Sequence, residues 1–198
     1  PDHKGGMMHF HPTEGYLYLS IGDGGYGHSA LPQNPPLSGP EGRTNNSGQD
    51  PSTLRGKFIR IKPEASLVNG KYYTVPSDNP FINTNGYLPE IWSMGHRNPW
   101  RWGFDSESPY SLWETEVGQD GFEEVNLVQK GKDYGWPVCE GTVNRGNLGG
   151  NPARNCATAN ANYLPPVEGY NHAAGQSIVG GLVYRGTALP NLSGSFIF

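Results

Sequence analysis

The sequence predicts an all-β protein, and three features carry this prediction. The 198-residue chain contains 29 glycines and 18 prolines, about twice their average share. Aromatic residues reach 12% of the chain, while charged residues make up only 16%. Apolar residues come in short runs that end at glycine-rich turns, and no stretch keeps a helical period beyond a turn or two. Helical bundles, coiled coils and disordered chains are therefore disfavoured.

The expected strands follow one another along the whole chain. Each is short, rich in aromatic or β-branched residues, and bounded by turn residues. In order they are residues 16–21, 56–61, 91–94, 102–105, 111–115, 123–128, 180–186 and 195–198. Glycine, proline, asparagine and other polar residues dominate the segments between them, so we expect loops or irregular structure at residues 26–53, 63–90 and 139–163.

A weak internal repeat suggests how the strands are grouped. Leu17-Tyr18…Ile21-Gly22-Asp23 resembles Leu112-Trp113…Val117-Gly118-Gln119 with one residue inserted. Propeller blades span ~40–50 residues, so the two copies would lie two blades apart. A sandwich of short strands is the alternative architecture.

Charge and hydropathy exclude two classes of partner. The chain has 14 Lys and Arg against 18 Asp and Glu, a net charge of −4, and no basic patch, so we expect no nucleic-acid partner. The longest apolar runs are only a few residues, so we expect no membrane span. The first residues contain no apolar signal region, and residues 194–198 resemble an unfinished strand. We therefore expect a single partial domain, residues 1–198, from a longer chain.

Two cysteines, Cys139 and Cys156, lie in one glycine- and asparagine-rich stretch. No CxxC or HxxxH spacing accompanies them, so a zinc site is disfavoured. A disulfide that closes this loop is our prediction, and two free thiols are the alternative. A disulfide implies export to the periplasm or out of the cell.

Two clusters combine residue types that catalyse or bind. Asp2 and His3 place a carboxylate beside a histidine, as in a general base with an orienting acid, although an ordinary exposed histidine is the alternative. Arg97 and Asn98 follow a strand and precede two tryptophans, where a guanidinium can grip a planar anion. The alternative is an arginine that stacks on tryptophan and caps turn carbonyls.

A third cluster, residues 116–124, concentrates four acidic residues in a glycine-containing turn. Calcium binds carboxylates and backbone carbonyls in such settings, whereas a solvated acidic turn is the alternative. We interpret Asp23, which stands between glycines, as a turn former rather than a ligand. His9 and His11 are interpreted as surface histidines.

Eight motifs follow one another along nearly the whole chain. They are Asp2-His3-Lys4-Gly5-Gly6-Met7, Tyr16-Leu17-Tyr18-Leu19-Ser20-Ile21-Gly22-Asp23-Gly24-Gly25, Leu54-Arg55-Gly56-Lys57-Phe58-Ile59-Arg60-Ile61, Pro76-Ser77-Asp78-Asn79-Pro80-Phe81, Gly95-His96-Arg97-Asn98-Pro99-Trp100-Arg101, Val117-Gly118-Gln119…Glu123-Glu124-Val125-Asn126, Tyr134-Gly135-Trp136-Pro137, and Ser177-Ile178 with Gly180-Gly181 and Val183-Tyr184-Arg185-Gly186. In this order they resemble the soluble glucose/sorbosone dehydrogenase family, whose enzymes use pyrroloquinoline quinone (PQQ).

The resemblance implies about half of a six-bladed β-propeller with four-stranded antiparallel blades, and a quinone over its central channel. It also implies a histidine that removes the proton of the sugar's anomeric hydroxyl while hydride passes to the quinone. By position, His3 matches that base and Asp2 its neighbouring carboxylate. Arg97 and Asn98 match the family's quinone contacts, and Trp100 joins them as a cofactor-binding candidate.

The resemblance further implies a calcium ion that binds the quinone. Gly118 and Gln119 match the pair whose backbone carbonyls hold this ion, and Glu123 matches an acid that reaches it through water. The expected substrate is an aldose sugar, oxidised to a lactone, and the electron acceptor is unspecified. The rest of its own propeller or another copy would complete the ring, so the isolated chain is expected to be inactive.

One departure keeps a second function open. Trp100 stands where the best-known glucose enzymes carry glutamine, and the form with tryptophan is common in other aldose dehydrogenases and in hedgehog-interacting-protein-like members. The alternative function is a non-catalytic extracellular propeller that binds a protein or glycan. A purely structural or assembly role is a third possibility. His3 beside Asp2, together with Arg97 and Asn98, favours the enzyme.

Overall fold

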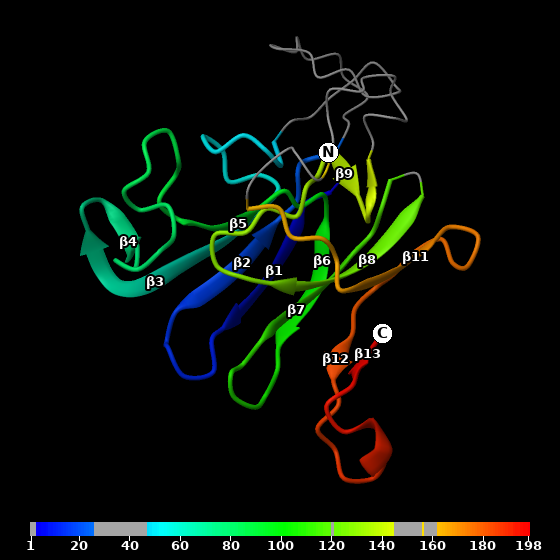
Figure 1. Ribbon diagram of the computed structural model, residues 1–198. Helices are drawn as coiled ribbons and strands as arrows, with labels where there is room; N and C mark the ends of the chain where they lie inside the picture. The colour runs from blue at the N-terminus through cyan, green and yellow to red at the C-terminus, as the bar shows by residue number, and fades with distance from the viewer. Residues whose placement is uncertain (1–2, 26–46, 120, 145–155, 157–161) are drawn as a thin grey trace.

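The computed structural model describes residues 3–25, 47–119, 121–144, 156 and 162–198. Its elements are β1 (Gly5–Phe10), β2 (Leu17–Ile21), β3 (Lys57–Val68), β4 (Lys71–Thr74), β5 (Ile91–Met94), β6 (Pro99–Phe104), β7 (Leu112–Glu116), β8 (Phe122–Val128), β9 (Cys139–Glu140), β10 (Val143–Asn144), β11 (Glu168–Asn171), β12 (Leu182–Val183), the 3₁₀ turn η1 (Pro190–Leu192) and β13 (Phe196–Ile197). The all-β prediction is therefore confirmed (Figure 1).

Two four-stranded antiparallel blades form the body of the described structure. In the first blade β1, β2, β3 and β5 pair in that order, while β4 pairs with the outer part of β3. In the second blade the order is β6, β7, β8 and β11. The short hairpin of β12 and β13 lies beyond the second blade (Figure 1).

The internal repeat marks equivalent strands of neighbouring blades. β2 and β7 are each the second strand of their sheet, and β1 and β2 contact β6 of the next blade. The expected separation of two blades is thus wrong. The long connection between β2 and β3 and the β3–β4 hairpin lengthen the first blade, so its sequence exceeds the usual blade length.

The hydrophobic core lies between the two blades. Tyr18 and Phe58 come from the first blade, and they pack against Trp102, Leu112 and Val128 of the second. The Phe58 and Trp102 rings meet edge to face with centroids 5.1 Å apart. Burying each of these large side chains contributes roughly 1.5–3 kcal/mol to folding, so this layer fixes one blade against the other.

Some segments expected to be irregular contain strands. β3 continues to Val68 and returns as β4 around Asn69 and Gly70, whose φ angles are 50° and 79°. Positive φ at both positions is what a two-residue hairpin turn requires, and Asn-Gly is the usual sequence for it. Pro63 interrupts the strand pattern and obscures this signal. The hairpin of β9 and β10 and the strand β11 were likewise not expected.

The predicted cysteine pair is confirmed. Cys139 and Cys156 form a disulfide with their Cα atoms 5.6 Å apart, and both are buried. The bridge anchors the start of β9 to the segment that precedes β11. In the part of the chain that the structure describes, no helix is long and apolar enough to cross a membrane.

Candidate active site

His3, Arg97 and the turn after β7 lie at one edge of the two blades. Across the first blade, a single row of paired residues marks this edge: Gly5, Ile21, Lys57 and Met94. In an antiparallel sheet the end of one strand lies beside the start of the neighbouring strand, at the same edge of the sheet. His3, Asp23 and Arg97 therefore lie just beyond this row. The turn between β7 and β8 adds residues 117–119 and 121 from the second blade (Figure 1).

His3 is oriented by Asp23. The His3 Nδ1 atom lies 2.8 Å from Asp23 Oδ1, and the two side chains are 14% and 0% exposed. Trp136 Nε1 donates to Asp23 Oδ2 at 2.8 Å, and the Gly25 amide donates to Oδ1 at 2.7 Å. Because the Asp23 oxygens accept from these N–H groups, we infer that Nδ1 of His3 donates as well. Nε2 of a neutral His3 is then the acceptor.

Backbone contacts bring His3 and Arg97 together. The Asp23 amide donates to the Arg97 carbonyl at 2.8 Å, and the Gly24 amide donates to the His3 carbonyl at 3.2 Å. A Cβ atom on Gly22 would lie 2.0 Å from the His3 carbonyl oxygen and 3.3 Å from that of Arg97. Only glycine therefore fits between these two segments.

The Arg97 side chain bridges the two blades. Its Nη2 and Nε donate to Gln119 Oε1 at 2.6 and 3.2 Å, and its Nη1 donates to the Val117 carbonyl at 2.8 Å. The guanidinium carbon lies 5.4 Å from the centre of the Trp136 ring. Trp136 thus touches both Asp23 and Arg97, and it joins the histidine and arginine clusters into one site.

Asn98 and Trp100 differ in their surroundings. Asn98 Oδ1 is buried and has no hydrogen-bond partner among the described residues. Trp100 is 44% exposed, and its ring centre lies 6.0 Å from the Arg101 guanidinium. Asn98 therefore has a buried oxygen next to Arg97 in the chain, whereas Trp100 lies at the surface beside Arg101. The other catalytic candidate, Asp2, lies outside the described residues.

The turn after β7 is held by two buried glutamates. Glu140 Oε1 accepts from the amides of Gln119, Gly121 and Phe122 at 2.8–3.1 Å. Glu123 accepts from Gly118 N, His172 Nε2 and Ile178 N, so both of its oxygens bond to protein groups. At Gly118 a Cβ atom would lie 1.9 Å from the Phe122 carbonyl oxygen, so a side chain cannot enter this turn.

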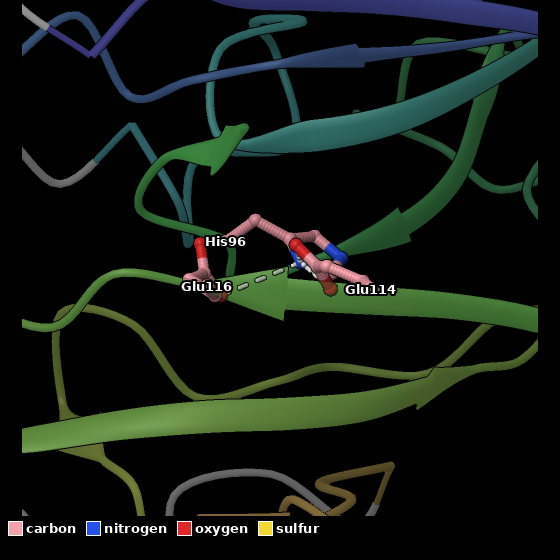
Figure 2. Close-up of side chains that lie close together, drawn as sticks. All are labelled: His96, Glu114 and Glu116. Carbon is pink, nitrogen blue, oxygen red and sulfur yellow. Dashed lines mark hydrogen bonds and ion pairs between the residues drawn. The ribbon is translucent and has the colours of Figure 1, made fainter. Parts of the chain in front are cut away.

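A buried cluster of charged residues lies next to Arg97. His96 Nδ1 is 3.1 Å from Glu114 and 3.7 Å from Glu116 (Figure 2). Its Nε2 is 2.9 Å from Ser93 Oγ. Burial lowers the pKa of His96, but the two glutamates outweigh it and raise this pKa to about 10. Burial also raises the pKa of Glu114 to about 7. Donor atoms of the three residues lie within 4.8 Å, close enough for a metal. A proton on Nδ1 accounts for the same contacts, so we interpret the cluster as ionic.

Comparison with known proteins identifies the family. The family model described as Glucose / Sorbosone dehydrogenase matches residues 1–198. The chain belongs to the glucose/sorbosone dehydrogenase family. It is 36% identical to the HIPL1 protein of Arabidopsis thaliana over 99% of the chain and 28% of that protein.

Solved structures of this family share the fold. A glucose dehydrogenase superposes with a TM-score of 0.64 at 26% identity, over 98% of this chain and 46% of the other. The PQQ-bound aldose sugar dehydrogenase of Streptomyces coelicolor gives 0.55 at 26% identity, over 91% and 39%. The chain therefore forms about half of a glucose/sorbosone dehydrogenase propeller.

Sequence reasoning missed several residues of this candidate site. Asp23 contacts His3, and its partners Gly25 and Trp136 could not be foreseen from spacing. From the sequence, Glu116 belongs to an acidic turn and Glu140 to an irregular stretch. In the structure both accept hydrogen bonds from backbone amides at the site. Their burial beside turn amides is a property of the assembled blades, and no local pattern indicates it.

The buried Glu124 side chain predicts how the stability of the protein depends on pH. Burial raises the pKa of Glu124 to about 8, with a further contribution from Glu116. Because the folded pKa lies above the ordinary 4.5, the native state binds more protons, and stability falls as pH rises from about 4.5 to 8. We expect the free energy of unfolding of Glu124→Gln to equal that of the parent at pH 5. At pH 9 it should exceed that of the parent by roughly 2–4 kcal/mol.

Urea unfolding of the full protein at the two pH values measures this difference. Glu168→Gln, which alters an exposed carboxylate on the neighbouring strand β11, is the matched control and should show no such pH dependence. An equal loss of stability in Glu124→Gln at both pH values would contradict the expectation.

Proposed function

We propose that the protein in which this chain occurs oxidises aldose sugars to lactones with PQQ and calcium. The observation that carries the proposal is the single network that links His3, Asp23, Trp136, Arg97 and Gln119. A proton acceptor and an anion-binding group thus lie side by side at one blade edge. The full activity needs more than this chain, because the chain spans 28% of HIPL1 and 46% of the solved glucose dehydrogenase.

The residues present fit an anionic quinone. Arg97 is held by Gln119 and Val117, so its guanidinium is fixed before a ligand binds. A guanidinium binds a carboxylate in bidentate fashion, and PQQ carries carboxylates. Asn98 Oδ1 is buried and unpaired among the described residues, so a ligand donor would satisfy it. Arg97 and Asn98 would therefore hold the quinone.

The described residues of the turn after β7, 117–119, 121 and 122, fit a calcium ion through their backbone. The amides of Gly118, Gln119, Gly121 and Phe122 all donate to glutamate oxygens. The turn is therefore fixed, and the carbonyls of Gly118 and Gln119 are the oxygen ligands that calcium would take. Glu123 would act through this turn, because both of its oxygens already bond to the protein.

His3 supplies the base for the sugar. Asp23 holds Nδ1–H, so Nε2 has the lone pair that takes the proton of the anomeric hydroxyl. Asp23 also stabilises the imidazolium that results, as an orienting carboxylate does in other base-catalysed sites. When bound, PQQ accepts the hydride of the anomeric carbon, and calcium polarises its carbonyl. The Cys139–Cys156 disulfide supports a periplasmic or extracellular location.

A second candidate is a non-catalytic extracellular propeller that binds a protein or glycan. The chain is 22% identical over 99% of its length to the Hedgehog-interacting protein of Homo sapiens, whose name states a protein partner, and this similarity favours the candidate. The exposed Trp100 fits either function. The His3–Asp23 pair favours the enzyme, because a binding surface has no need of an oriented base.

Dye reduction by the full protein tests the proposal. The protein is loaded with PQQ and calcium and assayed with a panel of aldoses. We expect turnover with at least one aldose, none without PQQ, and a loss on chelation that calcium reverses. Protein that binds PQQ but turns over no aldose would contradict the dehydrogenase activity and favour the binding function.

A further inference from the structure

A single carboxylate holds the backbone of both proposed quinone contacts. Glu116 Oε1 accepts the amide of Arg97 in a short hydrogen bond and the amide of Asn98 at 2.8 Å. These two residues end the four-residue connection between β5 and β6, where the Asp23 amide also donates to the Arg97 carbonyl. Glu116 holds the two amides, so it helps to set the direction in which both side chains leave the backbone.

Glu116 forms an ion pair with His96 at 3.7 Å, while the hydrogen bond of His96 Nδ1 goes to Glu114. The imidazole lies between Glu114 and Glu116 and is fully buried, and Figure 2 shows both carboxylates directed toward it. Tyr134 stacks on the ring at 4.8 Å, and Phe58 meets it edge-on at 4.9 Å. A buried carboxylate is costly unless a cation and donors satisfy it, and His96 provides that cation.

We propose that Glu116, clamped by His96, is a positioning residue that sets Arg97 and Asn98 for the quinone. This inference rests on the proposed function, because it assigns Glu116 a role toward the same cofactor. Glu116 itself touches no ligand. It acts through two amides, and the Arg97 guanidinium then meets Gln119 and the Val117 carbonyl at the far side of the site.

Glu116→Gln in the full protein tests the proposal. The amide side chain keeps the shape of glutamate but offers a neutral, weaker acceptor to the two amides. We expect PQQ affinity, titrated with calcium present, to fall about 10- to 100-fold. At saturating PQQ the KM for the aldose should stay within about threefold, because the proposal assigns this loop to the quinone and not to the sugar.

Glu124→Gln is the matched control, since it removes a buried carboxylate of the same blade. Glu124 bonds to Gly141 N and Asn126, and neither belongs to the Arg97 loop. Its PQQ affinity should equal that of the parent. If the parent itself binds no PQQ, the proposed function fails. If the parent binds PQQ and Glu116→Gln binds it equally, the positioning role is overturned.

A double-mutant cycle distinguishes an effect of Glu116 through Arg97 from an effect on PQQ affinity that does not depend on Arg97. If Glu116 acts through Arg97, the losses of PQQ affinity in Glu116→Gln and Arg97→Lys are not additive, and the double variant loses little more than the worse single one. Additive losses would overturn the proposal. Should Glu116→Gln fail to fold, Glu116→Asp replaces it, because the shorter carboxylate keeps the charge beside His96 but reaches the amides poorly. An unchanged affinity in that variant would also overturn the proposal.

Discussion

Replacing His3 by glutamine is expected to lower kcat for aldose oxidation by about 10²- to 10⁴-fold, the range for loss of a general base. Glutamine can still bond to Asp23, but its amide cannot take a proton from the sugar hydroxyl. PQQ affinity should stay within about threefold, because Arg97 and Asn98 are unchanged. Steady-state kinetics of the PQQ-loaded full protein measure the effect.

His9→Gln is the matched control for this prediction. His9 is an exposed histidine on β1 whose ring meets Trp102 edge-on at 5.0 Å, away from the Asp23 pair. The same substitution there should leave kcat unchanged. A His3→Gln protein that oxidises its aldose at nearly the parental rate would remove His3 from the base role and leave the His3–Asp23 pair as a structural contact.

Asp23→Asn provides an independent check on the base. Both oxygens of Asp23 accept N–H donors, so the amide nitrogen of asparagine would face a donor and drive His3 toward the tautomer that is protonated on Nε2. The base would then be blocked although the histidine remains. We expect kcat to fall by at least about 10²-fold, again with PQQ binding retained.

Replacing Lys57 by methionine is expected to lower the free energy of unfolding by at least about 3 kcal/mol. Lys57 is fully buried at the start of β3, and its ammonium donates to the carbonyls of Ser47, Gly48 and Arg55 at 2.5–3.0 Å. Three acceptors match the three protons of an ammonium, so methionine leaves all three carbonyls without this donor.

Chemical denaturation of the full protein measures this loss, with Lys62→Met as the control. Lys62 lies on the same strand, is 53% exposed, and bonds only to Glu64 among the described residues. Surface ion pairs contribute little, so the control should change stability by less than about 1 kcal/mol. Equal effects of the two substitutions would show that the Lys57 contacts do not stabilise the blade edge.

Local sequence determined much of the fold. The expected strands at residues 16–21, 91–94 and 123–128 correspond to β2, β5 and β8, because short aromatic and β-branched runs between glycine turns favour strands in any context. The order of motifs identified the family, and the cysteine count with its spacing predicted the disulfide. Even where the expectation was wrong, at the β3–β4 hairpin, the Asn-Gly signal was present in the chain.

Only the tertiary structure decided the partners within the site. His3 follows Asp2 in the chain, but its ring bonds to Asp23, and Glu116 holds the amides of a loop from a neighbouring connection. These contacts depend on strand register and on how one blade packs against the next. A shift of one residue in register turns every side chain of a strand to the opposite face. Residue type and spacing therefore indicate which chemical groups this chain has, whereas the assembled sheets determine which of these groups come into contact.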